Sequence, residues 1–510
     1  MSDLQPAPAP PPAARARAPW ATMGALLAVL GGVYIYRVAT GLYHPSVDDY
    51  VRMVWSREWG HNFWILTPNP YWPPLPNIVH GAVSGYWTTV NPFLQTLPSV
   101  LGLALAVVLL AWPHRARPEF FNGAGAAALM CLPVTHQLAA GHMSEPFFIP
   151  ALAGLFRAFL SFEAGPSRRA GLWLLVAANF PLWIRYEGWM YSAVLWAWAW
   201  AIHLRRHHRG DVTSWTANRW FLLGAGQLSL FPLAWMYQND RVMGDFLSFL
   251  KVAARENRSG PFWVRVEWSF DWTIGAAPVA AVIALAGLAL LLRRRDWKTL
   301  IVMAIIAFPF FATVLANKIQ TVFPERFPTG LHFCGCVLVA AAWQAARESG
   351  MLGGRMARVY LPAALAAGVA WAAAQTSVLA APTPAMELRM AGQRIREEMP
   401  PGTRALVLLT PDFRNTMEDT IVLEGGFETA RVVHEVWLWR EEQPFSAETL
   451  RKDNFVAVFY RNPAHLARVA APLGPERHMA IDWRVRFLLP EDASDDDAKA
   501  ADNHDATPAS

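Results

Sequence analysis

Two adjacent carboxylates, Asp48 and Asp49, are the side chains in this sequence best suited to chemistry. They lie in the segment Tyr43–Tyr50, directly after the first long apolar run. Aspartate is ionised at neutral pH, so it can take a proton from a hydroxyl group as a general base, which contributes typically ~10²–10⁴ in rate. Asp is also a favoured N-cap residue, and either carboxylate could cap the amphipathic helix predicted over Asp49–Trp59. A cap accounts for one carboxylate more easily than for two.

Other charged residues stand at the ends of the apolar runs that fill most of the chain. Each of them alone is more often a solvated helix end than a functional group. A helical bundle would nevertheless gather those on one side around a single cavity. They are His142, Glu145, Arg185, Glu187, Lys318 and Arg326. His142 and Glu145 have the i, i+3 spacing of helical metal ligands, but two ligands are too few, so no protein-only metal site is predicted.

The composition places these residues in a membrane protein. Only 16% of the 510 residues are charged, whereas soluble domains average about 25%, and 54% are hydrophobic. Apolar runs of about 20 residues are each long enough to cross a hydrocarbon core. The three cysteines lie in such runs and give neither a zinc spacing nor a disulfide framework. The sequence therefore excludes an ordinary cytosolic enzyme, a disordered scaffold and a disulfide-stapled secreted module.

About eleven apolar runs are predicted to span the membrane as α-helices. They cover roughly residues 20–41, 94–112, 120–138, 146–162, 170–184, 189–204, 218–236, 273–292, 299–316, 328–345 and 358–380. Six basic groups fall in alternate connections, and positive charge favours the cytoplasmic side. These groups are Arg15/Arg17, Arg115/Arg117, Arg168/Arg169, Arg205/Arg206/Arg209, Arg293/Arg294/Arg295/Lys298 and Arg347/Arg355/Arg358. This placement predicts a cytoplasmic N-terminus and explains most of the net charge of +5.

The chain divides into four predicted regions. Residues 1–19 form a Pro/Ala-rich, disordered cytoplasmic tail, and residues 20–380 form the transmembrane domain. Frequent charges and short β-rich runs predict a small α/β domain outside the membrane over 381–490. Its strands are expected at Thr403–Thr410, Asn454–Tyr460 and Trp483–Leu489, and its helices at Met386–Glu398 and Ser446–Lys452. Residues 491–510 hold seven acidic side chains and form a solvated tail.

The placement of the acidic pair resembles that of the GT-C superfamily of membrane glycosyltransferases, which use polyprenyl-phosphate-linked sugars. The shared features are the pair in the first outward loop, residues 42–93, the interfacial helix after it, about eleven spans and a soluble C-terminal domain. His44-Pro45 before the pair is similar to a motif of some mannosyltransferase branches, although Ser46 and Val47 intervene here. The likeness covers the architecture of residues 20–380 and only short stretches of sequence.

The resemblance implies an inverting transfer of a sugar to an acceptor hydroxyl on the periplasmic face of a bacterial inner membrane. Asp48 matches the first acidic position and is the expected base, with Asp49 as a supporting residue or second candidate. A lipid phosphate is a good leaving group and needs cations rather than a general acid. Arg326 and Arg185 are favoured because a guanidinium binds phosphate through two hydrogen bonds.

Further roles are implied for the residues around this centre. Lys318 and His142 are the other cations for the donor phosphate. Glu145 and Glu187 either orient the cations or bind sugar hydroxyls. The remaining substrate-binding candidates are His44, Tyr71 and Trp72. Aromatic faces suit sugars and lipid chains alike, although the two aromatic residues also fit a simple interfacial belt.

Some members of the family use a divalent cation, so an ion held by the acidic pair is left open, and no cofactor is firmly implied. The expected partners are the polyprenyl-phosphate sugar, membrane lipids and a glycan, lipid or protein acceptor, with no nucleic acid. Rival functions are a lipid-linked-glycan flippase or transporter, a glycan ligase or polymerase that uses polyprenyl diphosphates, and a non-catalytic assembly protein. Transporters carry functional charge near the bilayer midplane, whereas the charges here crowd the ends of the spans.

Overall fold

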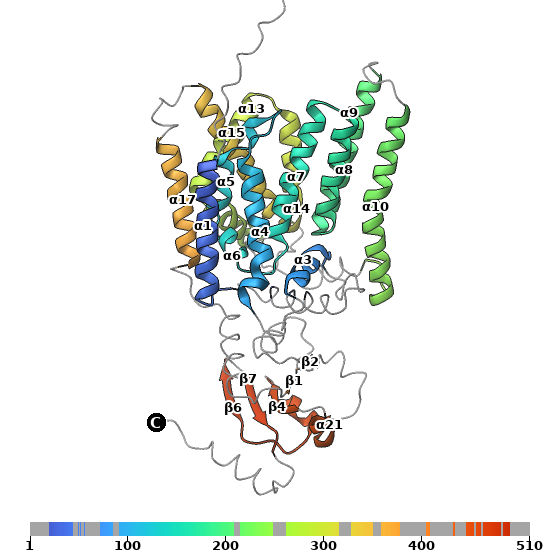
Figure 1. Cartoon of the computed structure of the whole chain (residues 1–510), viewed down its shortest axis with the longest axis vertical. Helices are drawn as coiled ribbons and strands as arrows, with labels where there is room; N and C mark the ends of the chain where they lie inside the picture. Colours follow the sequence, from blue (N-terminus) through green and yellow to red (C-terminus); the bar gives the residue numbers. More distant parts are fainter. Residues whose placement is uncertain are drawn as a thin grey trace, which may run out of the picture.

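The structure is a computed structural model of the whole chain, and Figure 1 shows a helical bundle with a smaller strand-containing part beyond one end of it. The residues that it describes are 20–43, 49, 52, 56, 72–84, 91–208, 215–247, 262–315, 328–349, 359–377, 404–408, 432–433, 445–452, 455–460, 463–480 and 483–489. All structural statements below concern these residues.

The bundle consists of α-helices that follow the apolar runs of the sequence. Their bounds are α1 (Trp20–Ala39), α3 (Leu75–Ser84), α4 (Pro92–Ala111), α5 (Gly123–Met130), α6 (Pro133–Leu138), α7 (Glu145–Ala164), α8 (Arg168–Leu182), α9 (Tyr186–His208), α10 (Trp215–Met243), α12 (Phe262–Phe270), α13 (Pro278–Arg293), α14 (Trp297–Leu315), α15 (Thr329–Ser349) and α17 (Leu361–Ser377). A 3₁₀ turn, η1, covers Pro118–Phe120, and a π turn, η2, covers Asp271–Gly275.

A helix occupies each of the eleven predicted ranges, but the range 120–138 holds two short helices instead of one span. Pro133 is the first residue of α6, and a proline there cannot continue the hydrogen bonds of a preceding helix. Among the described helices, α1, α4, α7 and α15 are long and apolar enough to cross a membrane, and α13 and α14 contain shorter apolar helices. The count of eleven crossings therefore stays a prediction.

The helices pack tightly inside and expose apolar side chains outside. At Gly287 of α13 a Cβ atom would lie 2.1 Å from the Leu338 carbonyl oxygen of α15, so only glycine permits this approach. On α10, by contrast, apolar residues lie exposed along the helix; they include Leu222, Leu223, Leu230 and Leu233. Apolar surface of this extent is suited to lipid rather than to water. The protein is therefore an integral membrane protein.

Two ends of the bundle are distinguished by α7. We call the end at which α7 begins and α3 lies the α3 end, and the end at which α7 finishes the opposite end (Figure 1). Twenty residues of α-helix separate them by about 30 Å. The connections after α4, after α7 and after α13 meet at the opposite end, where Arg117 contacts Asp296 and Lys298 contacts Glu163. The basic residues of the predicted groups that the structure describes lie at this end, in the connections after α4 and α13, at the start of α8 and in the last turns of α9 and α15.

The strands form a separate α/β unit beyond the α3 end (Figure 1). A five-stranded sheet has the order β2-β1-β4-β7-β6, with β1 parallel to its neighbours and β7 antiparallel to both of its own. Its strands are β1 (Arg404–Leu408), β2 (Val432–Val433), β4 (Phe455–Tyr460), β6 (Arg477–Ala480) and β7 (Trp483–Phe487); β3 (Phe445–Ser446) pairs with β5 (Val469–Ala470), and α21 covers Ala447–Lys452. The three predicted strands and the second predicted helix are confirmed, while the range 386–398 lies outside the described residues.

Candidate functional site

The turn between α6 and α7 holds one member of the acidic pair. The backbone N–H of His142 donates to Oδ1 of Asp49 across 2.5 Å, and Asp49 is fully buried. Arg37 of α1 attracts the same carboxylate electrostatically and also donates to the carbonyl oxygen of Thr376 in α17. Asp49 is thus fixed between a backbone donor and a cation, in a site closed to solvent.

The turn itself is held by α3 and α4. The ring of His80 stacks on that of His142 with 4.1 Å between their centroids. His80 also hydrogen-bonds through Nδ1 to the carbonyl oxygen of Gln95 at 2.9 Å and lies 3.3 Å through Nε2 from Oγ of Ser99. Ser99 donates to the carbonyl oxygen of Gly141 across 2.5 Å. The position of the His142 N–H, and so of Asp49, therefore depends on two neighbouring helices.

Three residues further on, the first residue of α7 belongs to a buried charge cluster. Glu145 has no exposed surface and pairs with Arg185, which also binds Glu187 with an N–O distance of 2.7 Å. Burial alone would lower the pKa of Arg185, but attraction by Glu187 and Glu145 outweighs it, and this pKa is raised above its ordinary value. The arginine is therefore a permanent cation held between two carboxylates.

This cluster has limited capacity for a further ligand as it stands. The two glutamates accept from three nitrogen atoms of Arg185, which leaves two of its five N–H donors for another acceptor. A cavity of about 20 Å³ beside Arg185 and Glu187, closed by Phe148, Tyr191 and Phe310, suits a single water molecule. Within the described residues, a phosphate or sugar would have to displace Glu187 to reach Arg185 through this cavity.

A third group surrounds Arg52, which is buried near the start of the interfacial segment. Its guanidinium lies 4.1 Å from the ring centroid of Trp72, a cation–π contact. It also acts electrostatically on Tyr186, whose hydroxyl accepts from Trp235 at 3.0 Å. One face of the predicted substrate-binding Trp72 is therefore covered by an arginine of this chain.

The structure brings six of the predicted site residues to the α3 end: Asp49, Trp72, His142, Glu145, Arg185 and Glu187. The turn 142–145 joins the Asp49 contact to the Glu145–Arg185 pair, and three residues span at most about 11 Å. Asp48, His44, Tyr71, Lys318 and Arg326 lie outside the described residues. Among the described residues, no three His, Cys, Asp or Glu side chains come together in a way that could hold a metal ion.

Sequence analysis missed three members of this region: Arg37, Arg52 and His80. Arg37 did carry a usable signal, because an arginine inside an apolar run is costly and usually marks a function or a partner. Arg52 follows Asp49 by three residues, which places both on one face of a helix. His80 lies in the short helix α3, and no sequence pattern there predicts that its ring stacks on that of His142.

Comparison with known proteins identifies the fold through solved structures and not through sequence. No protein-family model matches the chain, and no curated protein sequence matches it. The crystal structure of ArnT from Cupriavidus metallidurans bound to undecaprenyl phosphate matches with a TM-score of 0.60 at 13% identity, over 93% of this chain and 99% of that one. The structure of the same protein in the apo state matches with a TM-score of 0.57 at 14% identity, over 92% and 98%. ArnT is a GT-C glycosyltransferase, so the GT-C-like fold expected from the sequence is confirmed.

Proposed function

We propose that this protein transfers a sugar from a polyprenyl-phosphate donor to an acceptor hydroxyl at the α3 end of the bundle. The observation that carries the proposal is the turn 142–145, which joins a buried aspartate to a buried glutamate–arginine pair at one end of a membrane bundle. The fold supports the same function, since a solved structure that shares it over nearly its whole length is of a protein bound to undecaprenyl phosphate. At 13% identity, the donor class comes to this chain as part of the proposal.

The two aspartates of the acidic pair have different roles in the proposed reaction. Oδ1 of Asp49 is already occupied by the backbone N–H of His142, and Arg37 attracts the same carboxylate. We therefore assign Asp49 a positioning role and its neighbour Asp48 the role of general base. The acceptor oxygen attacks the anomeric carbon, its proton passes to Asp48, and the bond from that carbon to the phosphate oxygen breaks. Direct displacement inverts the anomeric configuration and releases the polyprenyl phosphate.

Cations stabilise the departing phosphate in this scheme. Arg185 is the described candidate, because it keeps two donors beyond those taken by its glutamates. Lys318, Arg326 and His142 are the other predicted cations. Arg52 adds to them as a buried guanidinium close to Tyr186 at the same end of the bundle. A divalent ion, if the reaction uses one, would belong with the acidic pair.

The orientation of the site forms part of the proposal. Basic residues gather at the opposite end of the bundle, and such residues favour the cytoplasmic side. The α3 end would then face the periplasm, together with the C-terminal α/β unit beyond it. The acceptor, whether glycan, lipid or protein, would reach the site from that side.

The test is a transfer assay with purified full-length protein and a panel of synthetic polyprenyl-phosphate sugars. Asp48→Asn should lower kcat by about 10²-fold or more, the contribution expected of a general base. Asp49→Asn should lower it less, because an amide oxygen still accepts from the His142 N–H. Unchanged transfer by Asp48→Asn would contradict the base assignment. If no donor is consumed by the wild type, the transporter function would be favoured instead.

A further inference from the structure

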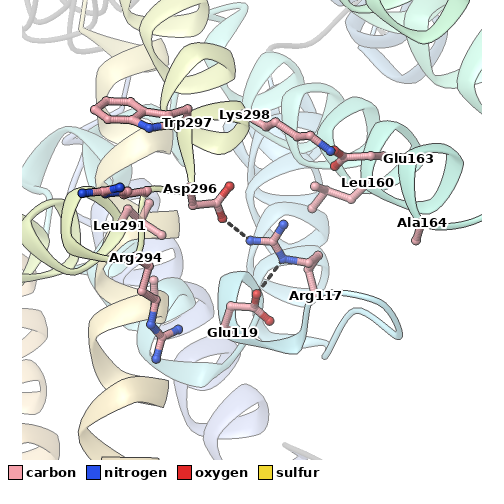
Figure 2. Close-up of a pocket in the computed structure, with 12 residues that line it drawn as sticks. Arg117, Glu119, Leu160, Glu163, Ala164, Leu291, Arg294, Asp296, Trp297 and Lys298 are labelled. Carbon is pink, nitrogen blue, oxygen red and sulfur yellow. Dashed lines mark hydrogen bonds and ion pairs between the residues drawn. The ribbon is translucent and has the colours of Figure 1, made fainter. Parts of the chain in front are cut away.

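A cavity of about 730 Å³ lies at the opposite end of the bundle from the proposed active site. It opens between the connection after α4, the last turn of α7 and the connection from α13 to α14, with Arg117, Leu160, Asp296 and Lys298 among its lining residues (Figure 2). Its volume lies within the range of sites for small organic ligands. Nothing in the proposed transfer reaction uses it, because it is separated from Glu145 by the length of α7.

Each carboxylate that lines this cavity already forms an ion pair with a basic side chain of the protein. Arg117 lies between Glu119, at 2.6 Å, and Asp296, with which it also forms an ion pair (Figure 2). Lys298 extends to Glu163 with an N–O distance of 2.9 Å. Asp296 in addition caps α14, accepting from the N–H and the hydroxyl of Thr299. The acidic side chains and the helix N-terminus are therefore satisfied within the protein.

Two further cations in the lining are not compensated. Arg294 and Arg295 are exposed, and neither guanidinium has a hydrogen bond or an ion pair with any residue in the described part of the chain. The cavity thus carries four basic and three acidic side chains, with the surplus positive charge on its rim.

The backbone at the rim is unusual. Arg295 has φ 53°, the left-handed conformation that normally selects glycine at the end of a helix. The N–H groups of Arg295 and Asp296 donate back to Leu292 and Leu291, which identifies the turn as a Schellman motif. Strain of this kind is often found at ligand sites. Here the strained conformation places a cation, not a glycine, on the rim of the cavity.

We propose that this cavity binds the phosphate of an anionic phospholipid headgroup through Arg294 and Arg295. The cavity lies at the ends of membrane-spanning helices, where headgroups are found. Leu160 and Leu291 give it apolar lining suited to the glycerol and upper acyl region, and the largely exposed Trp297 is typical of the membrane interface. Basic pockets between helices are known to take anionic headgroups. A soluble phosphate would use the arginines but gain nothing from the apolar lining.

The test measures lipid binding to delipidated full-length protein in detergent by native mass spectrometry. Phosphatidylglycerol, phosphatidylcholine and inorganic phosphate are the three probes. Wild type should bind phosphatidylglycerol more tightly than phosphatidylcholine, and inorganic phosphate should not displace it. The double variant Arg294→Gln/Arg295→Gln should weaken phosphatidylglycerol binding about thirtyfold, which corresponds to about fivefold per arginine near an anionic headgroup. The variant Arg294→Lys/Arg295→Lys keeps the charge and should retain most of the affinity.

The matched control is Arg168→Gln/Arg169→Gln, which removes two exposed arginines from the start of α8 at the same end of the bundle but outside the cavity. This control should bind as the wild type does. Equal weakening in both glutamine variants would overturn the proposal, since it would indicate diffuse surface charge. Displacement by inorganic phosphate would do so too, by indicating a soluble anion, as would equal binding of phosphatidylcholine. A thermal unfolding scan of each variant confirms that binding is compared between folded proteins.

Discussion

Helix α7 carries a glutamate near each end, and the two are held in opposite ways. Glu145 is fully buried and shares Arg185 with Glu187, whereas Glu163 pairs with Lys298, whose side chain is 67% exposed. Desolvation makes an uncompensated buried charge very costly, while an exposed pair is screened by water and contributes little. The charge cluster at the α3 end is therefore costly to rearrange. The opposite end is a surface whose free cations can bind a ligand without rearrangement.

The largest expected effect comes from breaking the buried pair. Arg185→Gln removes the cation that Glu145 and Glu187 share in a closed site, which should lower the free energy of unfolding by about 3–5 kcal/mol. Lys298→Gln, the matched change at the other end of α7, should cost at most about 1 kcal/mol. Chemical unfolding of both variants in detergent micelles compares the two. Similar losses would mean that the two ends of α7 do not differ in the way described.

The two ends of the bundle also show which features of the fold and of the site can be predicted from a single sequence. Apolar runs predicted where the helices lie because each helix must present apolar side chains to lipid or to the core. The charged residues at the ends of the apolar runs predicted Glu145, Arg185 and Glu187 as a group. The helices of a membrane bundle end at one of two faces, so the residues at the ends on one face lie near one another. Arg37 could have been singled out as an arginine inside an apolar run, but its contact with Thr376, 339 residues away in the chain, could not be predicted. No periodic pattern carries that kind of contact.

The opposite end was interpreted from the sequence as a topology signal alone. That interpretation accounts for the sign of the charges but not for their pairing. Arg117 and Arg295 count equally in a sum of charges, yet the guanidinium of Arg117 is held by two carboxylates and that of Arg295 has no partner among the described residues. Arg117 is paired because the connection after α4 packs against the connection after α13, which carries Asp296. This contact distinguishes arginines with a structural role from those that remain available to a ligand.

A second, smaller effect concerns pH at the opposite end. Burial raises the pKa of Asp296, but hydrogen bonds and attraction from Arg117 outweigh it and hold this pKa below its ordinary value. A carboxyl with a lowered pKa in the folded state stabilises the fold above its unfolded pKa, and this contribution is lost as the pH falls through the folded value. Asp296→Asn keeps the N-cap and removes the charge. It should therefore lower the free energy of unfolding at pH 7 by about 1–2 kcal/mol.

The pH profile distinguishes the ion pair from the cap. The difference between wild type and Asp296→Asn should begin to shrink as the pH falls below about 4, where the carboxyl of the unfolded chain becomes protonated, and should vanish as the pH falls through the lower pKa of the folded state. Unfolding of both proteins across acidic pH checks this. A difference that stays constant down to the lowest pH would assign the effect to the altered cap rather than to the contact with Arg117.

The smallest expected effect is that of Arg295→Gly, which should increase stability but decrease lipid binding. Arg295→Gly removes the left-handed strain at φ 53°, so in lipid-free detergent it should raise the free energy of unfolding by about 1 kcal/mol. Arg294→Gly removes the same charge at φ −76°, where glycine relieves nothing, and should not stabilise. Both should weaken binding of phosphatidylglycerol. Because a bound ligand adds its own stabilisation to the wild type, the gain from Arg295→Gly should shrink when that lipid is added. A gain that is unaffected by the lipid would mean that the arginine at this position makes no contribution to headgroup binding.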